Sequence, residues 1–394
     1  MILSRRAALL GLTGCVGFGR ASLALAAAPT DRRLVVIILR GALDGMAAVV
    51  PYGDPGLAAL RGEIVPPTPG QPDGVLDLGG FYGLHPALAG LHSLYQANEA
   101  LVIHSVAGPY RVRSHFEAQD CLESGADRRM TSGWLNRVVG VLPVAPVPRA
   151  EGDALAVGVS VPLLLRGPAP VANWAPRGFA QPAPELYAMI AALNADDPVT
   201  GSAIRQGLRD RGFTASVLAG EEQPKDRNAF PALAQAAGEM LRAPDGPRIA
   251  ALELGGWDTH TAQVRRLEGP LKQLDAGLLA LRTGLGPAWT RTAVLVMTEF
   301  GRTARINGTK GTDHGTATVA FLLGGAVAGG HVRASWPGLA PGQLFEDRDL
   351  APTTDLRSVA RGLLAQHLDL DAAALERVFP GSSGAGLMRG IIRT

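Results

Sequence analysis

The stretch that decides the fold is RRLVVIILRGALDG, residues 32–45. Its centre, Leu34 to Leu39, is an unbroken run of apolar and largely β-branched residues, which is typical of a strand buried on both faces of a sheet. The run ends in a glycine-flanked turn that carries Asp44. Because ligands of open α/β sheets bind beyond the carboxyl ends of the strands, this turn is a candidate position for a functional site.

Apolar runs and amphipathic helical patterns alternate along the rest of the chain. Further strands are predicted at 100–106, 248–256, 292–301 and 318–325, and helices at 85–98, 114–124, 263–285 and 354–368. This alternation predicts an α/β fold with a mostly parallel sheet and helices on both faces. We expect one domain over residues 29–394, with a proline-rich and helical insertion at 143–245. Inside the insertion we expect short strands at 154–159 and 161–165 and three helices within 184–242.

The composition limits the class of protein. The 394 residues are 47% hydrophobic, which provides a large core, and only 18% charged with a formal net charge of +2. That balance argues against a nucleic-acid platform and against an acidic tail. The chain contains only Cys15 and Cys121. We expect no intramolecular disulfide once the N-terminal segment has been removed.

The N-terminus has the pattern of an export signal. The segment SRRAALLGLTGCVGFGRASLALAAAP has twin arginines, Arg5 and Arg6, then an interrupted apolar stretch and small residues. This pattern predicts a twin-arginine signal peptide over residues 1–28, and hence passage through the Tat translocon to the periplasm or the medium. The apolar stretch is too short to span a bilayer, so no integral membrane span is expected in the mature form. Cys15 also lies in a possible lipoprotein cleavage box, which leaves lipidation open.

Two Asp/His clusters follow apolar runs. They are GGWDTH at 255–260 and GTDHGTA at 311–317, and both are expected to reach the sheet edge that carries the first turn. Carboxylate and imidazole groups suit a divalent ion such as Zn, Mn, Mg or Ca. The predicted metal ligands are Asp44, Asp258, His260, Asp313 and His314. Structural roles stay open for each, as turn, cap or packed residues, and Glu299 is either an ion-pair partner of Arg302 or an additional site residue.

A serine stands at the predicted start of the helix that follows the second strand. Ser114, with Glu117 three residues later, forms a capping-box pattern, and a helix N-terminus also favours a bound phosphate or sulfate. Ser114 and His115 are therefore the candidate catalytic residues, with a plain helix cap as the alternative for Ser114. Positive charge for the anion is expected from Arg111, Arg113 and Arg302.

Five motifs together resemble the family called domain of unknown function 1501. They are LRGALDG, RSHFEAQDCLESG, GGWDTH, TEFGRTARINGTKGTDHGTA and PTTDLRSVARGLL, and the resemblance covers about residues 33–370. That family looks like a distant branch of the alkaline phosphatase and sulfatase superfamily. The resemblance implies an alkaline phosphatase-like three-layer αβα fold. It also implies Ser114 at the nucleophile position and the Asp and His residues above as metal ligands. The sulfatase Cys-x-Pro-x-Arg motif is absent, since LESG follows Cys121.

These observations predict an exported, metal-dependent hydrolase of phosphate or sulfate esters acting on a small-molecule or polysaccharide ester. The alternative is a non-catalytic envelope or polysaccharide-binding protein that retains the fold. An exported oxidoreductase is a third reading, suggested by the type of signal alone. Each depends on whether segments far apart in the chain meet at one edge of the sheet.

Overall fold

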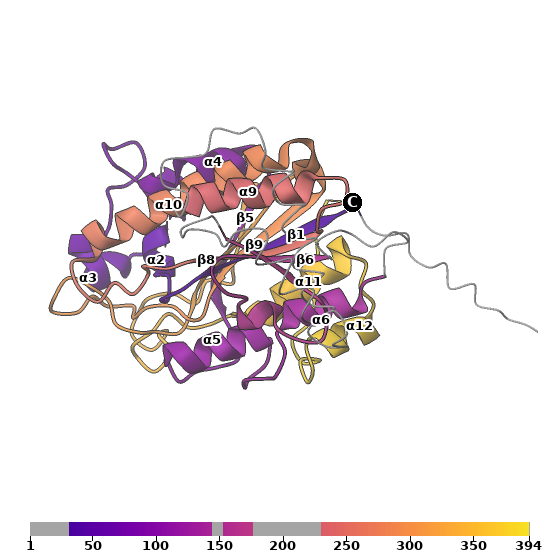
Figure 1. The fold of residues 1–394 in the computed structure, drawn as a ribbon. Coiled ribbons are helices and arrows are strands. Elements are labelled where there is room, and N and C mark those ends of the chain that lie inside the picture. Colours follow the sequence, from indigo (N-terminus) through magenta and orange to yellow (C-terminus); the bar gives the residue numbers. More distant parts are fainter. Residues whose placement is uncertain (1–30, 144–152, 176–229, 394) are drawn as a thin grey trace, which may run out of the picture.

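The computed structural model describes residues 31–143, 153–175 and 230–393. Over these residues a nine-stranded sheet forms the centre of the molecule (Figure 1). Its order is β11 (His331–Arg333), β5 (Ala100–Ala107), β10 (Thr318–Leu323), β9 (Thr292–Thr298), β1 (Arg33–Leu39), β8 (Ile249–Leu254), β6 (Ala154–Val157) and β7 (Ala172–Trp174), with β12 (Thr354–Asp355) beside β5.

The sheet is mostly parallel. The central strand β1 pairs in parallel with β8 and β9, and the pairs β6–β8, β6–β7, β11–β5 and β12–β5 are parallel as well. Strand β10 runs antiparallel to both of its neighbours, β9 and β5. The predicted α/β class with a mostly parallel sheet is therefore confirmed.

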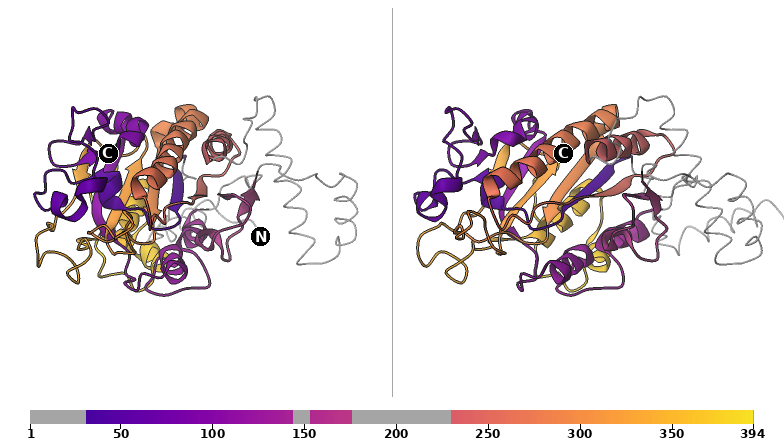
Figure 2. Two further views of the ribbon diagram at one scale, coloured as in Figure 1. Left: turned by 90° about the vertical axis from the view of Figure 1, so that its left-hand side faces the viewer. Right: turned by 60° about the vertical axis from the view of Figure 1, so that its left-hand side comes forward.

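Strand β1 contributes side chains to the hydrophobic core on both faces of the sheet. Val35, Ile37 and Leu39 of β1 belong to one hydrophobic cluster, and the alternate residues of the same strand belong to the other. The first cluster packs against α4 (Ala89–Gln96), α9 (Phe230–Arg242) and α10 (Gln263–Leu285). The second packs against α6 (Trp134–Val141), α11 (Leu356–His367) and α12 (Ala372–Val378). These helices lie on opposite sides of the sheet, which gives three layers (Figures 1 and 2).

Shorter elements complete the described part of the chain. Helix α5 (His115–Ser124) follows β5, while α2 (Gly45–Ala48) and α3 (Leu57–Arg61) follow β1. A small second sheet joins β2 (Val49–Val50), β4 (Gly83–Leu84) and β3 (Leu76–Asp77). One expectation is wrong: the apolar segment 161–165 contains a 3₁₀ turn at Leu163–Leu165 instead of a strand. Pro162, directly before the turn, has no N–H group and cannot donate a backbone hydrogen bond to a neighbouring strand.

Two sequence predictions fall largely outside the described residues. The signal segment 1–28 lies there entirely, and so do residues 144–152 and 176–229 of the expected insertion. Within the described residues, no helix is both long enough and apolar enough to cross a membrane.

The direction of β10 decides what gathers at one edge of the sheet. Strands β1, β5, β8 and β9 end at this edge, whereas β10 begins there, with Thr318 opposite Val106 near the end of β5. The long segment between β9 and β10 therefore leaves and re-enters the sheet at the same edge. This edge, the carboxyl edge, carries the site described next.

Candidate metal centre

Four segments of the chain meet at the carboxyl edge. His115 is the first residue of α5, shortly after β5, and Asp258 and His260 follow β8. His314 precedes β10 and forms an isolated antiparallel bridge with Arg302, which follows β9. The loops approach closely because Gly311 has no side chain: a Cβ there would lie 2.1 Å from the carbonyl carbon of His260.

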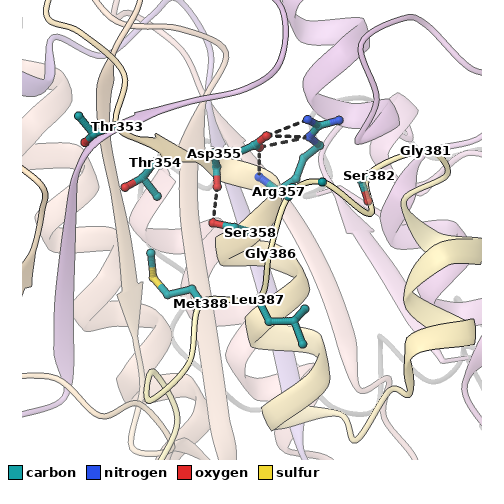
Figure 3. Close-up of a pocket in the computed structure, with 12 residues that line it drawn as sticks. Thr353, Thr354, Asp355, Arg357, Ser358, Gly381, Ser382, Gly386, Leu387 and Met388 are labelled. Carbon is teal, nitrogen blue, oxygen red and sulfur yellow. Dashed lines mark hydrogen bonds and ion pairs between the residues drawn. The ribbon is translucent and has the colours of Figure 1, made fainter.

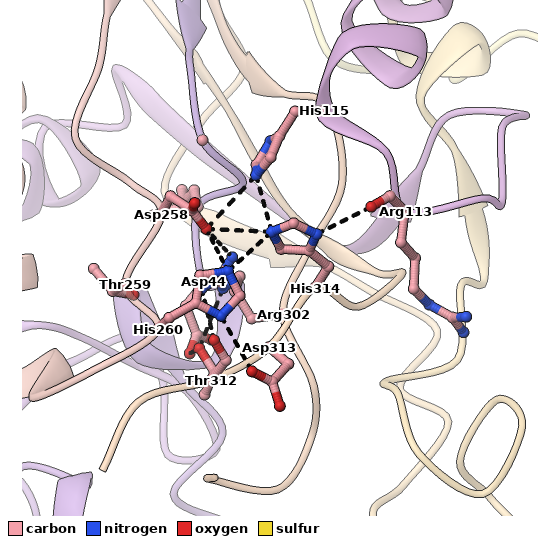
Figure 4. A network of polar contacts seen from close by, with 12 residues as sticks. Asp44, Arg113, His115, Asp258, Thr259, His260, Arg302, Thr312, Asp313 and His314 are labelled. Carbon is pink, nitrogen blue, oxygen red and sulfur yellow. Dashed lines mark hydrogen bonds and ion pairs between the residues drawn. The ribbon is translucent and has the colours of Figure 1, made fainter. Parts of the chain in front are cut away.

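Three imidazoles and one carboxylate point toward each other (Figure 4). The Nε2 atom of His314 lies 3.0 Å from Nε2 of His115 and 3.0 Å from Nε2 of His260. The Asp258 Oδ1 atom lies 3.6, 3.0 and 3.3 Å from the Nε2 atoms of His115, His260 and His314, respectively. Ligand atoms of His115, Asp258 and His314 all lie within 4.8 Å of one another, and His260 stands beside this set.

The opposite nitrogen of each ring is held by an oxygen. His115 Nδ1 lies 2.9 Å from Glu299 Oε1, and His260 Nδ1 lies 3.1 Å from Asp313 Oδ1. His314 Nδ1 lies 3.0 Å from the backbone carbonyl of Arg113. A carbonyl or an ionised carboxylate can only accept, so each Nδ1 carries the hydrogen and each Nε2 presents its lone pair to the centre of the cluster. Such oxygen partners typically orient metal-binding histidines.

The electrostatics of the cluster keep its carboxylates ionised. Burial alone would raise the pKa of Asp258, but the hydrogen bond from Arg302 Nη1 (2.7 Å) and neighbouring charges hold that pKa below its usual value. The pKa of Glu299 is likewise lowered, because bonds from His115 and Gln119 outweigh its burial. Burial would also raise the pKa of Asp313, but hydrogen bonds from Asn307 and His260, together with nearby positive charge, lower it below its usual value. All three groups therefore act as acceptors at neutral pH.

The histidine pKa values move in opposite directions. The hydrogen bond to Glu299 raises the pKa of His115. Burial, followed by the charge of His115, lowers the pKa of His314. A proton on His115 Nε2 would satisfy its contact with His314 Nε2, but His260 Nε2 lies 3.0 Å from that same His314 nitrogen and 3.0 Å from Asp258 Oδ1. A cation among these lone pairs would satisfy all of them at once, so the donor set fits a divalent metal ion.

Asp44 takes a different position from the predicted one. Both of its oxygens accept from Arg61 Nη1, at 2.9 and 2.7 Å, and both side chains are 1% exposed. Asp44 also caps α2 through the Ala47 N–H, and its Oδ2 accepts from Gln263. Its charge is thus neutralised by Arg61, and its oxygens already accept hydrogen bonds from other residues of the protein. It lies beside the cluster, since Thr312 Oγ1 contacts both Asp44 Oδ2 and Arg302 Nε, but it is not aimed into the cluster.

Asp313 likewise differs from its predicted role as a direct ligand. Its Oδ1 accepts from His260 Nδ1 and from Asn307 Nδ2. It therefore orients a ligand, while its neighbour His314 supplies the nitrogen that reaches the centre. Of the five residues predicted as ligands, the structure brings together Asp258, His260 and His314 directly.

The three arginines predicted to bind an anion are engaged elsewhere. Arg302 is buried and donates to Asp258 and to the Thr312 carbonyl. Arg113 pairs with Asp349 and Glu346. Arg111 donates to the backbone carbonyls of Gly108 and Tyr110.

Asp355 and Arg357 belong to a separate cavity of about 470 Å³ between the start of α11 and the loop at 381–388 (Figure 3). These two side chains pair with each other through several contacts, the shortest at 2.7 Å. The cavity therefore offers no unpaired charge of its own, and none of the histidine cluster lines it.

Ser114 holds the N-cap position of α5 without capping it. No hydrogen bond from its side chain to the helix backbone is present, although the residue has extended backbone angles (φ −100°, ψ 121°). The phenol of Tyr110, which donates to Glu117 of the same helix, lies beside the Ser114 hydroxyl. The residue is partly exposed and directly precedes the ligand His115.

Two members of the site were not assigned their observed roles from the sequence. His115 was expected to act in catalysis but its Nε2 joins the ligand cluster, and Glu299 orients it instead of pairing with Arg302. The usable signal for both was position, since each directly follows a buried strand or its turn at the carboxyl edge. His331 lies opposite Leu101 at the start of β5, which is the other end of that strand.

Comparison with known proteins identifies the family. The family described as "Protein of unknown function (DUF1501)" matches residues 97–379, most of the chain, and the chain therefore belongs to it. No curated protein matches.

We compare three of the solved structures to which this chain is similar over most of its length. They are Ps i-CgsB in complex with k-i-k-neocarrahexaose (TM-score 0.43, 10% identity, 91% of this chain and 77% of that chain), the C-terminal periplasmic domain of EcEptC from Escherichia coli in complex with Zn (0.31, 11%, 75% and 73%), and phosphonate monoester hydrolase of Agrobacterium radiobacter (0.34, 10%, 85% and 73%). At these scores and identities the likenesses carry no argument about what this chain does.

Proposed function

We propose that this protein is an exported, metal-dependent hydrolase of phosphate or sulfate esters. The observation that carries the proposal is the convergence of three imidazole Nε2 atoms on Asp258 Oδ1, while every Nδ1 is held by an oxygen acceptor. Several imidazole lone pairs that face one another are costly unless a proton or a cation lies among them. Export follows from the twin arginines at Arg5 and Arg6, and it would place the enzyme in the periplasm or the medium.

The proposed centre holds one cation. Its ligands are His115, Asp258 and His314, with His260 as the adjacent fourth. A second divalent ion would need the charge of Asp44, but Arg61 already neutralises that carboxylate inside the protein. Three imidazoles and one carboxylate favour Zn, with Mn next, over Mg and Ca, which prefer oxygen ligands.

The exposure of the cluster allows a substrate to reach it. The side chains of Asp258 and His260 are 46% and 41% exposed, whereas Arg302 beneath them is fully buried. Arg302 fixes Asp258 from below and adds a positive charge close to where an ester oxyanion would bind. A divalent ion at this position supplies Lewis acidity, which polarises the ester and lowers the pKa of an attacking hydroxyl or water.

Ser114 is the proposed nucleophile. Its hydroxyl precedes a ligand by one residue and stands at the N-terminus of α5, where backbone N–H groups favour an anion. The Ser114 Oγ would attack the central phosphorus or sulfur and the ester oxygen would leave as the alcohol. Water would then release the phosphate or sulfate and restore the serine. Tyr110 already donates its hydroxyl hydrogen to Glu117, so the serine proton would pass to the Tyr110 oxygen while the phenol hydrogen moves to the Glu117 carboxylate.

Metal analysis and turnover of aryl esters test the proposal together. We expect one equivalent of metal per chain of purified exported protein, loss of aryl phosphatase or sulfatase activity with a chelator, and recovery with Zn or Mn. Asp258→Asn and His314→Gln should lose the metal, and Ser114→Ala should keep it but lose turnover. The matched control is His331→Gln, which should retain both. Metal without any turnover on the ester panel would favour a binding protein, and absence of metal would overturn the proposal.

A further inference from the structure

A buried carboxylate outside the histidine cluster is linked to it through one arginine. Asp349 is fully buried, although it lies in a loop between β11 and β12. Its Oδ2 accepts from Arg113 Nε at 2.9 Å and lies 2.8 Å from Arg113 Nη2. The same oxygen accepts from the Thr316 hydroxyl at 2.8 Å. Asp349 thus holds the guanidinium of Arg113 by two of its nitrogens.

Arg113 acts on two ligands of the proposed centre through its backbone. Its carbonyl accepts from Nδ1 of His314, as Figure 4 shows, and the chain continues through Ser114 to His115 at the start of α5. The backbone of Arg113 has φ +25°, a conformation that side-chain-bearing residues rarely adopt. Such a conformation persists only when surrounding contacts enforce it, and the bond to Asp349 is the buried contact of this side chain.

Asp349 and His314 are also fixed to the same piece of backbone. Arg302 forms an isolated bridge with His314, and the next residue, Thr303, forms one with Asp349. Side chains strengthen this contact, because Thr316 lies two residues after His314 and donates to Asp349. Asp349 therefore sets the position of the Arg113 carbonyl relative to the His314 ring, which that carbonyl orients.

We propose that Asp349 is a positioning residue of the metal centre, acting through Arg113 to fix the ring of His314 and the entry of His115. This inference rests on the proposed metal centre, and it assigns a role to a residue that touches neither the ligands nor the substrate. Loss of an oxygen partner behind a ligating histidine typically lowers metal affinity 10- to 100-fold. We expect an effect toward the lower end of that range, since Asp349 acts one contact further away.

A purely structural ion pair is the competing explanation, and metal affinity separates the two. The mature exported protein would be stripped of metal. Its dissociation constant for Zn would then be measured by competition with a chromogenic chelator, at a temperature well below the unfolding temperature of each variant. Asp349→Asn should raise this constant about tenfold. Glu346→Gln is the matched control, because it removes the other, 56% exposed, carboxylate partner of Arg113 and should change the constant less than about twofold.

A second control corrects for general destabilisation. Leu363 lies fully buried in α11, and Leu363→Ala should lower stability without changing the affinity for Zn. If Asp349→Asn fails to fold, Arg113→Lys gives the same answer, since it keeps the charge but cannot offer two nitrogens to Asp349.

The outcomes are distinguishable. A tenfold weaker affinity in Asp349→Asn or Arg113→Lys, with both controls near wild type, supports the positioning role. Unchanged affinity in a destabilised Asp349→Asn protein overturns that role and leaves the metal centre intact. A wild-type protein that binds no Zn, Mn or other divalent ion overturns the metal centre itself.

Discussion

The most informative perturbation exchanges the same atom in two aspartates that the sequence presents as equivalent. Asp44→Asn and Asp258→Asn each replace one carboxylate oxygen by an amide nitrogen. Asp44 faces Arg61 with both side chains 1% exposed, whereas Asp258 is 46% exposed and faces three imidazoles. We expect Asp44→Asn to reduce stability and leave metal content intact, and Asp258→Asn to lose the metal at a smaller cost in stability.

The magnitudes follow from burial. At 2.7 Å the gross attraction of the Asp44–Arg61 pair is about 6 kcal/mol at an effective dielectric constant of about 20. Removal of one charge from such a buried pair, with its partner left inside, typically costs about 3–5 kcal/mol. Arg302 is also fully buried, but it keeps the Thr312 carbonyl as an acceptor, and Asp258 itself is half-exposed to water, so Asp258→Asn should cost the metal-free protein less stability than Asp44→Asn does.

Urea unfolding with a chelator present measures the first quantity, and elemental analysis of protein purified without chelator measures the second. The reasoning would be refuted if Asp44→Asn lost its metal while it unfolded at the wild-type urea concentration. That result would mean that Asp44 is a ligand and that its pairing with Arg61 gives way to the ion.

Three further outcomes are expected. Glu299→Gln should weaken Zn binding 10- to 100-fold in a chelator competition, because His115 loses the carboxylate that orients its ring; affinity equal to wild type would contradict the assigned contact. Burial lowers the pKa of His104 to about 4, so the unfolded chain binds the extra proton first as pH falls from about 6.5. Stability present above pH 6.5 should therefore fall by up to about 3 kcal/mol toward pH 4, and His104→Gln should flatten that part of the profile in thermal melts at stepped pH. Gly311→Ala should separate the two ligand-bearing loops, since its Cβ would meet the His260 backbone at 2.1 Å, and lowered metal content at unchanged expression is the check.

Much of the fold was predictable because burial on both faces leaves a clear pattern. A strand such as β1 at the centre of a parallel sheet must be apolar on both sides, so the run Leu34 to Leu39 could be recognised without any knowledge of its neighbours. The segment 161–165 shows the limit of this kind of prediction. Its apolar residues fill the core from a 3₁₀ turn, and an apolar pattern alone does not distinguish such a turn from a short strand.

The gathering of the site residues was also predictable in outline. Asp258, His260, Glu299 and His115 all come soon after strands that end at one edge, and parallel strands bring their ends together. The sequence did not reveal the direction of β10, but that direction is what returns His314 to the same edge.

The sequence by itself determined the class of fold and the edge of the sheet where its acids and histidines meet, because both follow from local patterns of burial. Only the tertiary structure decided which of those groups face a common centre. Arg61 on α3 pairs with Asp44 and holds it away from the centre. Glu299, 184 positions from His115 in the sequence, binds His115 Nδ1 and orients its Nε2 toward the centre. Packing between distant segments determines such partners. The sequence therefore does not show whether a given aspartate pairs with an arginine or faces open space.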